Sequence, residues 1–174
     1  CAWQLRFHLC TEYMLSTTSQ WPLTTKAVRQ ITPGFMLDHL RQNPLTRACY
    51  PTSFGYYPHA KGHQMLRDDH SDNLLIYCDD GNGHVKTDKF YGPVTKGDVI
   101  LLPSGHTHHY WASDDNPWTI YWVHFDGLQA NQLIKELDFD AEQVVASIGQ
   151  QPLLASDFNR LLSLRQSGYR QTVF

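Results

Sequence analysis

The stretch Gly97–Phe125, GDVILLPSGHTHHYWASDDNPWTIYWVHF, decides the predicted fold. It contains two apolar runs with the composition of β-strands, Asp98–Pro103 and Trp118–Phe125. Four of the ten histidines and three of the five tryptophans of the chain also lie in it. Such a concentration of aromatic and polar rings predicts a pocket that these residues line.

Outward from this stretch, residues 50–127 have the pattern of short strands separated by turns. Asn73–Cys78 is a short apolar run, and the DDGNG sequence that follows predicts a hairpin returning through His84–Tyr91. The reason is that Asp-Gly and Asn-Gly pairs supply the positive φ of a tight turn. A second hairpin loop is predicted at Ser113–Pro117. Short strands at intervals of roughly 8–12 residues predict an antiparallel sandwich or barrel.

Both flanks of the barrel carry helical patterns. Apolar residues recur at helical spacing at 3–14, around Met36, at about 128–138 and from Ser156 onward. The chain therefore divides into a partly helical N-terminal extension or arm (1–48), the barrel (49–127) and a C-terminal helical segment (128–174). The predicted fold class is mainly β with C-terminal helices.

Composition excludes several classes of function. The net charge is −3, so no global electrostatic attraction favours nucleic acid or an anionic membrane. No apolar run approaches the roughly 20 residues that span a bilayer. The four cysteines are scattered without a CxxC pair, which is typical of a reducing compartment and predicts a cytoplasmic protein.

Strand alternation argues against a metal site in the histidine-rich segment. His106, His108 and Tyr110 share one face of a strand, whereas His109 lies on the other, so adjacent histidines cannot share an ion in a regular strand. No Ser-His-Asp, paired-carboxylate or phosphate-binding motif is visible either. We therefore predict no metal, no cofactor and no catalytic residues.

The spacing Gly97-x5-Pro103-x-Gly105-x2-His108 is similar to the second motif of the cupin barrels. Joined to WTIYWVHFDG, it resembles the sensor domain of AraC-type transcription regulators, with a resemblance that covers roughly residues 54–170. The resemblance implies a cupin-like double-stranded β-helix that binds an effector and is followed by dimerising helices. It also implies that a homodimer contacts DNA only through helix-turn-helix units, whose pattern this sequence lacks.

Six residues are predicted to bind the ligand. If the interior is the side of His108 and Tyr110, the last strand supplies Trp118 and Trp122 across it. By the resemblance, Arg67, Tyr110 and Trp122 match ligand contacts of arabinose-type sensors, and Tyr57 falls near another. Ile120 replaces a sugar-contacting histidine of that family.

Each assignment has a structural alternative. The two tryptophans could instead belong to a core between sheets, and His108 could instead form a hydrogen bond with the barrel backbone. Arg67 has Asp68 and Asp69 as alternative partners.

These patterns together predict a non-enzymatic, effector-sensing domain of a bacterial AraC-type regulator, which binds a sugar or similar small polar molecule. The main alternative is a stand-alone cupin enzyme, such as a sugar isomerase or a metal-dependent dioxygenase. A third is a fragment whose principal role is dimerisation.

Overall fold

The computed structural model describes residues 21–68 and 70–164, which form ten strands and three helices. In chain order these are β1 (Val28–Ile31), α1 (Gly34–Gln42), β2 (Tyr50–Tyr57), β3 (Gln64–Arg67), β4 (Asn73–Asp80), β5 (Asn82–Thr87), β6 (Tyr91–Thr95), β7 (Asp98–Leu102), β8 (His108–Ala112), β9 (Thr119–Asp126), α2 (Ala130–Glu136), β10 (Val145–Ser147) and α3 (Pro152–Ser163).

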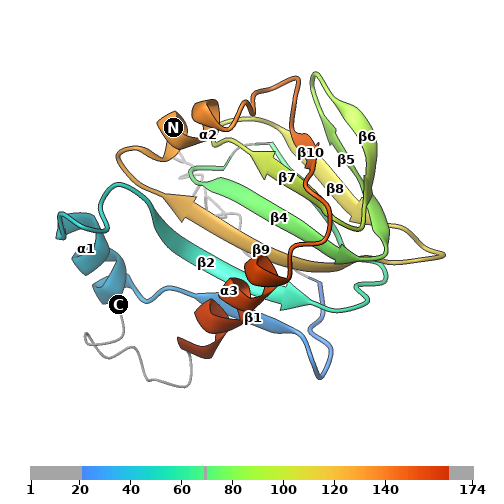
Figure 1. Ribbon diagram of the computed structural model, residues 1–174, viewed down its shortest axis with the longest axis horizontal. Coiled ribbons are helices and arrows are strands. Elements are labelled where there is room, and N and C mark those ends of the chain that lie inside the picture. Colours follow the sequence, from blue (N-terminus) through green and yellow to red (C-terminus); the bar gives the residue numbers. More distant parts are fainter. Residues whose placement is uncertain (1–20, 69, 165–174) are drawn as a thin grey trace, which may run out of the picture.

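The strands make two antiparallel sheets that face each other (Figure 1). The larger sheet has six strands in the order β1-β2-β9-β4-β7-β10, and the smaller has four in the order β3-β8-β5-β6. Helices follow the barrel in the chain. The predicted fold class, a mainly β antiparallel barrel with C-terminal helices, is confirmed.

The main core lies between the two sheets. In β8, the side chains of His108, Tyr110 and Ala112 are buried while those between them are only half-buried, as the alternation of strand faces requires. Buried residues of both sheets meet in one cluster that includes Ile76, Val85, Ile100, Tyr110 and Trp122. A cavity opens within this cluster.

The outer face of the six-stranded sheet is covered in part by α3 (Figure 1). Phe158 of α3 packs on Tyr121 of β9, with ring centroids 5.2 Å apart and planes inclined by 22°. Tyr77 and Val99 belong to the same buried cluster. The central strands are therefore apolar on both faces, which explains the continuous apolar runs in the sequence.

Both predicted hairpins are wrong. β4 and β5 are joined through Gly81, whose φ is +69°, but they belong to different sheets, and β5 pairs with β6 instead. The segment Ser113–Pro117 likewise connects β8 of the small sheet to β9 of the large one. A local turn signal predicts the change of direction, but long-range pairing decides which sheet the next strand enters.

The two connections between sheets contact each other at one end of the barrel. The amide of Asn82 donates to the carbonyl oxygen of Asn116 at 3.0 Å. A Cβ on Gly81 would lie 2.5 Å from the carbonyl oxygen of Pro117, so this position needs glycine for space as well as for its positive φ. The close approach draws the sheets together beside Trp118.

The helices begin near the predicted positions. α1 lies around Met36 and α2 lies within 128–138, as predicted. α3 starts at Pro152, earlier than the predicted start at Ser156. The earlier start is possible because proline fits the first turn of a helix. The predicted helix at 3–14 lies outside the described residues.

The predicted boundary after residue 48 stays a prediction. β1, which belongs to the first predicted part, pairs with β2 in register from Val28↔Tyr56 to Ile31↔Ser53.

Among the helices of residues 21–68 and 70–164, none is long and apolar enough to cross a membrane.

Candidate functional site

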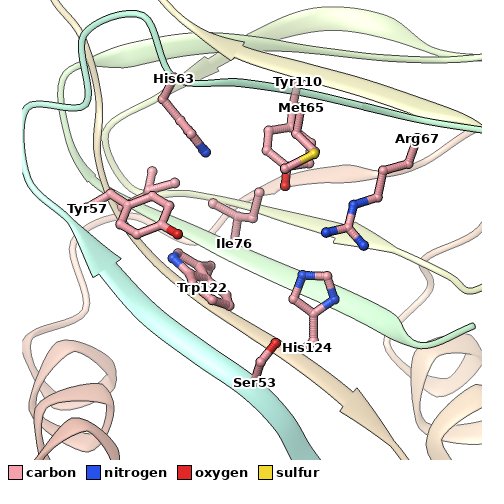
Figure 2. Close-up of a pocket in the computed structure, with 10 residues that line it drawn as sticks. Ser53, Tyr57, His63, Met65, Arg67, Ile76, Tyr110, Trp122 and His124 are labelled. Atoms are coloured by element: carbon pink, nitrogen blue, oxygen red, sulfur yellow. The ribbon is translucent and has the colours of Figure 1, made fainter. Parts of the chain in front are cut away.

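A cavity lies between the sheets, and side chains from five strands and one loop surround it (Figure 2). The free space among these side chains, counted together with the adjoining open solvent, is about 330 Å³. Apolar and aromatic groups form most of the wall, with a few polar groups among them, as small-molecule sites require. The lining residues are Ser53, Tyr57, His63, Met65, Arg67, Ile76, Tyr110, Ile120, Trp122 and His124.

The alternation of β9 places three of these side chains on the inner face. Ile120, Trp122 and His124 point inward, while Tyr121 between them contacts α3. Trp122 pairs in register with Gly55 of β2, and a Cβ on Gly55 would lie 2.4 Å from the indole ring. Glycine at position 55 therefore provides the space in which the indole lies against β2.

His63 presents a hydrogen-bond donor to the cavity. Trp118 Nε1 donates to His63 Nδ1 at 3.3 Å, and an indole nitrogen can only donate. His63 Nδ1 is therefore the acceptor, and a neutral ring carries its proton on Nε2. Burial, with a smaller contribution from Arg29, lowers the pKa of His63 to about 4, so the ring is neutral at pH 7. Among the described residues, His63 Nε2 has no hydrogen-bond partner.

An N-terminal segment contacts the same end of the cavity. Trp21, which is 9% exposed, packs on Tyr57 and His63 with ring centroids 4.8 and 5.6 Å away. Arg29 fixes this arrangement, because its Nη2 donates to the carbonyl oxygen of Trp21 and its Nε donates to the hydroxyl oxygen of Tyr57, each at 2.8 Å. The segment before β1 thus packs against two residues of the cavity wall.

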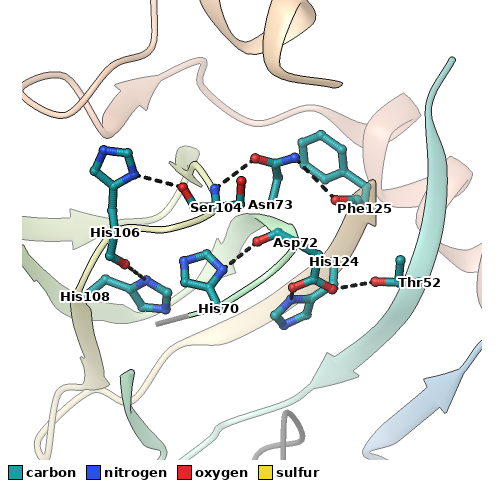
Figure 3. A network of polar contacts seen from close by, with 9 residues as sticks. All are labelled: Thr52, His70, Asp72, Asn73, Ser104, His106, His108, His124 and Phe125. Atoms are coloured by element: carbon teal, nitrogen blue, oxygen red, sulfur yellow. Dashed lines mark hydrogen bonds and ion pairs between the residues drawn. The ribbon is translucent and has the colours of Figure 1, made fainter. Parts of the chain in front are cut away.

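A polar network supports the opposite end (Figure 3). His124 Nδ1 donates to Asp72 Oδ1 at 3.0 Å, and the hydroxyl of Thr52 donates to the other carboxylate oxygen at 2.6 Å. Burial alone would raise the pKa of Asp72, but the hydrogen bonds and charge of His124, with Thr52 and His70, hold it below its usual value. Asp72 is therefore ionised and orients His124, which points into the cavity.

A second pair of histidines lies beside this network. The rings of His70 and His108 meet edge to face with centroids 4.4 Å apart, and His108 stacks on Tyr110. Their Nδ1 atoms bond the backbone carbonyls of Asp72 and His106 respectively. Burial lowers the pKa of both rings, that of His108 to about 3 with a further contribution from His70. Both rings are therefore neutral at pH 7, with unprotonated Nε2 atoms that have no partner among the described residues.

Four of the six predicted ligand-binding residues line the cavity and two do not. Arg67, Tyr110, Trp122 and Tyr57 belong to the lining. His108 is 1% exposed and lies behind Tyr110, where it bonds the backbone, and Trp118 is fully buried and supports His63. For these two residues the structure agrees with the structural alternative.

Several lining residues were not predicted. His124 shares a strand face with Trp122, so alternation alone could have indicated it. Met65 and Ser53 carry no such signal, because their places depend on pairing between distant strands, and His63 lies in the loop before β3. Among residues 21–68 and 70–164, no group of three His, Cys, Asp or Glu side chains could hold a metal ion.

Comparisons with known proteins agree with this architecture. The AraC-like ligand binding domain family matches residues 50–170. The chain is 38% identical over 160 residues to the MmsAB operon regulatory protein of Pseudomonas aeruginosa, an alignment covering 90% of this chain and 52% of the relative. The chain thus spans about half the length of that curated relative.

Two solved structures match the chain at low similarity. A cupin 2 conserved barrel domain protein from Salinispora arenicola matches 78% of this chain and 99% of its own, with a TM-score of 0.43 and 18% identity. YhaK from Escherichia coli matches 60% of this chain and 46% of its own, with a TM-score of 0.43 and 15% identity.

Proposed function

Because the chain belongs to the AraC-like ligand-binding domain family, we propose that it is the effector-sensing part of a bacterial transcription regulator and not an enzyme. The effector, a sugar or similar small polar molecule, binds in the cavity between the two sheets. The observation that carries this proposal is the cavity itself, in which the Trp122 ring and the Tyr57 ring lie beside unpartnered polar atoms of His63 and Trp122.

The aromatic walls support a ring-shaped or aliphatic ligand. Tyr57 and Trp122 have ring centroids 5.4 Å apart and belong to neighbouring strands. An indole or phenol face packs against C–H groups, while polar groups at the edge satisfy hydroxyl or carboxyl oxygens. Ile120 stands where arabinose-type sensors resembling this chain carry a histidine, so arabinose itself is not the proposed effector.

The proposed mechanism is a shift between two arrangements of the regulator. Trp21 contacts two cavity residues, so an effector that stabilises Tyr57 and His63 also stabilises the N-terminal segment against the barrel. That change then biases a homodimer toward one mode of DNA contact. In this proposal, DNA is bound by helix-turn-helix units outside this sequence, and the regulator acts in the cytoplasm.

The proposal is tested by titrating a panel of sugars and sugar acids into the chain and into two variants, Trp122→Ala and Arg67→Ala. Each variant is expected to weaken effector binding at least tenfold, because each removes a direct contact in the wall of the cavity. Calorimetry measures the affinities.

Two matched variants serve as controls. Trp111 lies on the outer face of β8, where it stacks on His84 at 5.4 Å, and Arg160 of α3 is exposed. Trp111→Ala and Arg160→Ala should bind as the unmodified chain does. If both cavity variants bind the effector as tightly as the unmodified chain does, the effector binds outside this cavity.

A stand-alone cupin enzyme is the second candidate. The observation that favours it is the pair of unprotonated, unpartnered Nε2 atoms of His70 and His108, since bare imidazole nitrogens are common metal ligands. Elemental analysis of the purified chain separates the two candidates. Stoichiometric iron, manganese or zinc would favour the enzyme.

A further inference from the structure

Trp118, which lies behind the cavity, and His63, which lies in its wall, form a hydrogen-bonded pair. Trp118 Nε1 donates to His63 Nδ1 at 3.3 Å, and the ring centroids are 5.9 Å apart. Both side chains are buried, with Trp118 0% and His63 2% exposed. A buried indole N–H needs an acceptor, and the imidazole supplies it through Nδ1. The neutral imidazole therefore carries its own proton on the other nitrogen, Nε2.

The backbone holds this pair in place. The amide of Ala60 donates to the carbonyl oxygen of Trp118 at 2.8 Å, and the amide of His63 donates to that of Ala60 at 3.0 Å. The amide of Ala112 in β8 donates to the carbonyl oxygen of His63 at 2.8 Å. On the other side, a Cβ on Gly83 would lie 2.3 Å from the Trp118 ring. This close packing fixes which imidazole nitrogen meets the indole.

Two N–H donors remain at this end of the cavity. His63 Nε2 and Trp122 Nε1 are buried and have no hydrogen-bond partner among the described residues. Both rings contact the ring of Tyr57, with centroids 5.1 and 5.4 Å away, and Figure 2 shows the three side chains grouped together. Because unsatisfied buried donors are rare in native proteins, these two atoms indicate an acceptor that the effector brings.

Two N–H donors also select the type of oxygen that binds them. A carbonyl oxygen has acceptor sites and no proton of its own, so it satisfies donors without adding a new one. A hydroxyl oxygen accepts as well, but its proton then needs a further acceptor. Neither ring supplies one, because an indole nitrogen and a protonated imidazole nitrogen only donate.

We propose that Trp118 is a positioning residue that fixes the proton of His63 on Nε2, and that the effector binds His63 and Trp122 through a carbonyl-type oxygen. This inference rests on the proposed function of the same cavity and specifies the group by which the effector is recognised there. An alcohol with the same carbon skeleton binds more weakly, because its hydroxyl proton finds no acceptor on either ring.

The first test locates the proton of His63 in the absence of any ligand. Long-range proton–nitrogen correlation spectra at pH 7 distinguish a protonated imidazole nitrogen from an unprotonated one. In the unmodified chain, His63 should be protonated at Nε2 alone. In Trp118→Phe, which keeps an aromatic ring without an N–H, part of the population should carry the proton on Nδ1. Trp111→Phe, on the outer face of β8, is the matched control and should leave His63 unchanged.

Two outcomes of this test would overturn the role of Trp118. One is a His63 ring that is protonated at Nδ1 in the unmodified chain. The other is a folded Trp118→Phe variant in which the proton stays on Nε2 alone. If that variant does not fold, the spectrum of the unmodified chain still decides where the proton lies.

The second test compares uncharged carbonyl compounds with the alcohols of the same skeleton. The pairs are dihydroxyacetone and glycerol, cyclopentanone and cyclopentanol, and cyclohexanone and cyclohexanol. Titration into the chain is followed by the signals of Trp122 Nε1–H and the His63 ring. In at least one pair, the carbonyl compound should bind about fivefold or more tightly. Equal or tighter binding of the alcohols in the pairs that bind would overturn the inference and leave the proposed sensor function standing. Absence of binding by all six compounds would contradict both.

Variants of His63 then separate the donor from the bulk of the ring. His63→Leu fills the wall without a donor and should lose the preference for the carbonyl compound. His63→Gln offers Trp118 an amide oxygen and the cavity an amide N–H, so it should restore part of the preference relative to His63→Leu. A folded His63→Leu variant that keeps the full preference would assign the recognition to another residue and overturn the role of His63.

Discussion

At the scale of single residues, the buried histidines couple the stability of the barrel to pH. His63 is 2% exposed and His108 is 1% exposed, and burial, the largest cause in each case, lowers their pKa values to about 4 and about 3. In the unfolded chain both rings take up a proton near pH 6.5. Between these values the unfolded state binds more protons than the folded state, so the free energy of unfolding decreases as the pH falls.

We expect the free energy of unfolding to fall between about pH 7 and pH 5, and replacement of His63 by glutamine to reduce that dependence. Below pH 6.5, one neutral buried histidine contributes a slope of about 1.4 kcal/mol per pH unit, which His63→Gln removes. Urea denaturation at several pH values in this window measures the slope.

His39→Gln is the control for this experiment. His39 lies on the exposed side of α1, so its replacement should leave the slope as it is in the unmodified chain. A His63→Gln variant with an undiminished slope would show that His63 is protonated in the folded state.

At the scale of elements, β9 joins the ligand cavity to the helical layer. Its inner face carries Trp122 and His124 into the cavity, and its outer face carries Tyr121 against Phe158 of α3. Asn159 of α3 also bonds the hydroxyl of Tyr121, with its amide nitrogen 3.3 Å away. One strand thus contacts both the cavity and helix α3.

Phe158→Ala is expected to lower the free energy of unfolding by about 3 kcal/mol, because it removes a ring that is 6% exposed and stacked on Tyr121. Chemical denaturation followed by far-ultraviolet circular dichroism measures the loss. Leu153→Ala on the same helix should change stability by less than about 0.5 kcal/mol, since Leu153 is 80% exposed. Equal effects of the two variants would contradict the docking of α3 through Phe158.

At the scale of the whole molecule, the site depends on residues that are distant in the sequence. Trp21, Tyr57, His63 and Trp122 form one chain of ring contacts, although they come from the N-terminal segment, β2, a loop and β9. Tyr57 and Trp122 lie on paired strands of the six-stranded sheet, whereas His63 lies just before β3 of the four-stranded sheet. We therefore expect the conformation of the N-terminal segment and the occupancy of the cavity to be coupled through Tyr57 and His63.

Trp21→Ala is expected to weaken effector binding about fivefold, because an aromatic contact contributes roughly 1 kcal/mol beyond the area that it buries. Leu23→Ala is the control, since Leu23 lies in the same segment and is 47% exposed. Calorimetry measures the affinities, and hydrogen exchange at residues 21–27 should slow when effector is added. Unchanged affinity in Trp21→Ala together with unchanged exchange would separate this segment from the site.

The sequence determined the local features, because they are encoded in residues that are neighbours along the chain. Strand alternation placed Tyr110 on the inner face of β8 and Trp122 on the inner face of β9, and helical spacing located α1 and α2. The motif around Gly97–His108, with the strand after it, was enough to identify the family. Four of the six residues predicted to bind ligand also lie in the wall of the cavity.

Only the tertiary structure decided which strands pair and which side chains meet. The turn signal at Gly81 predicts two paired strands of one sheet, but β5 belongs to the other sheet. Pairing between distant strands and burial of both inner faces outweigh the local turn preference. The same long-range packing brought His63 beside Trp118, which fixes its proton on the cavity side. The donors that the cavity presents to a ligand follow from this packing, and no pattern along the chain encodes it.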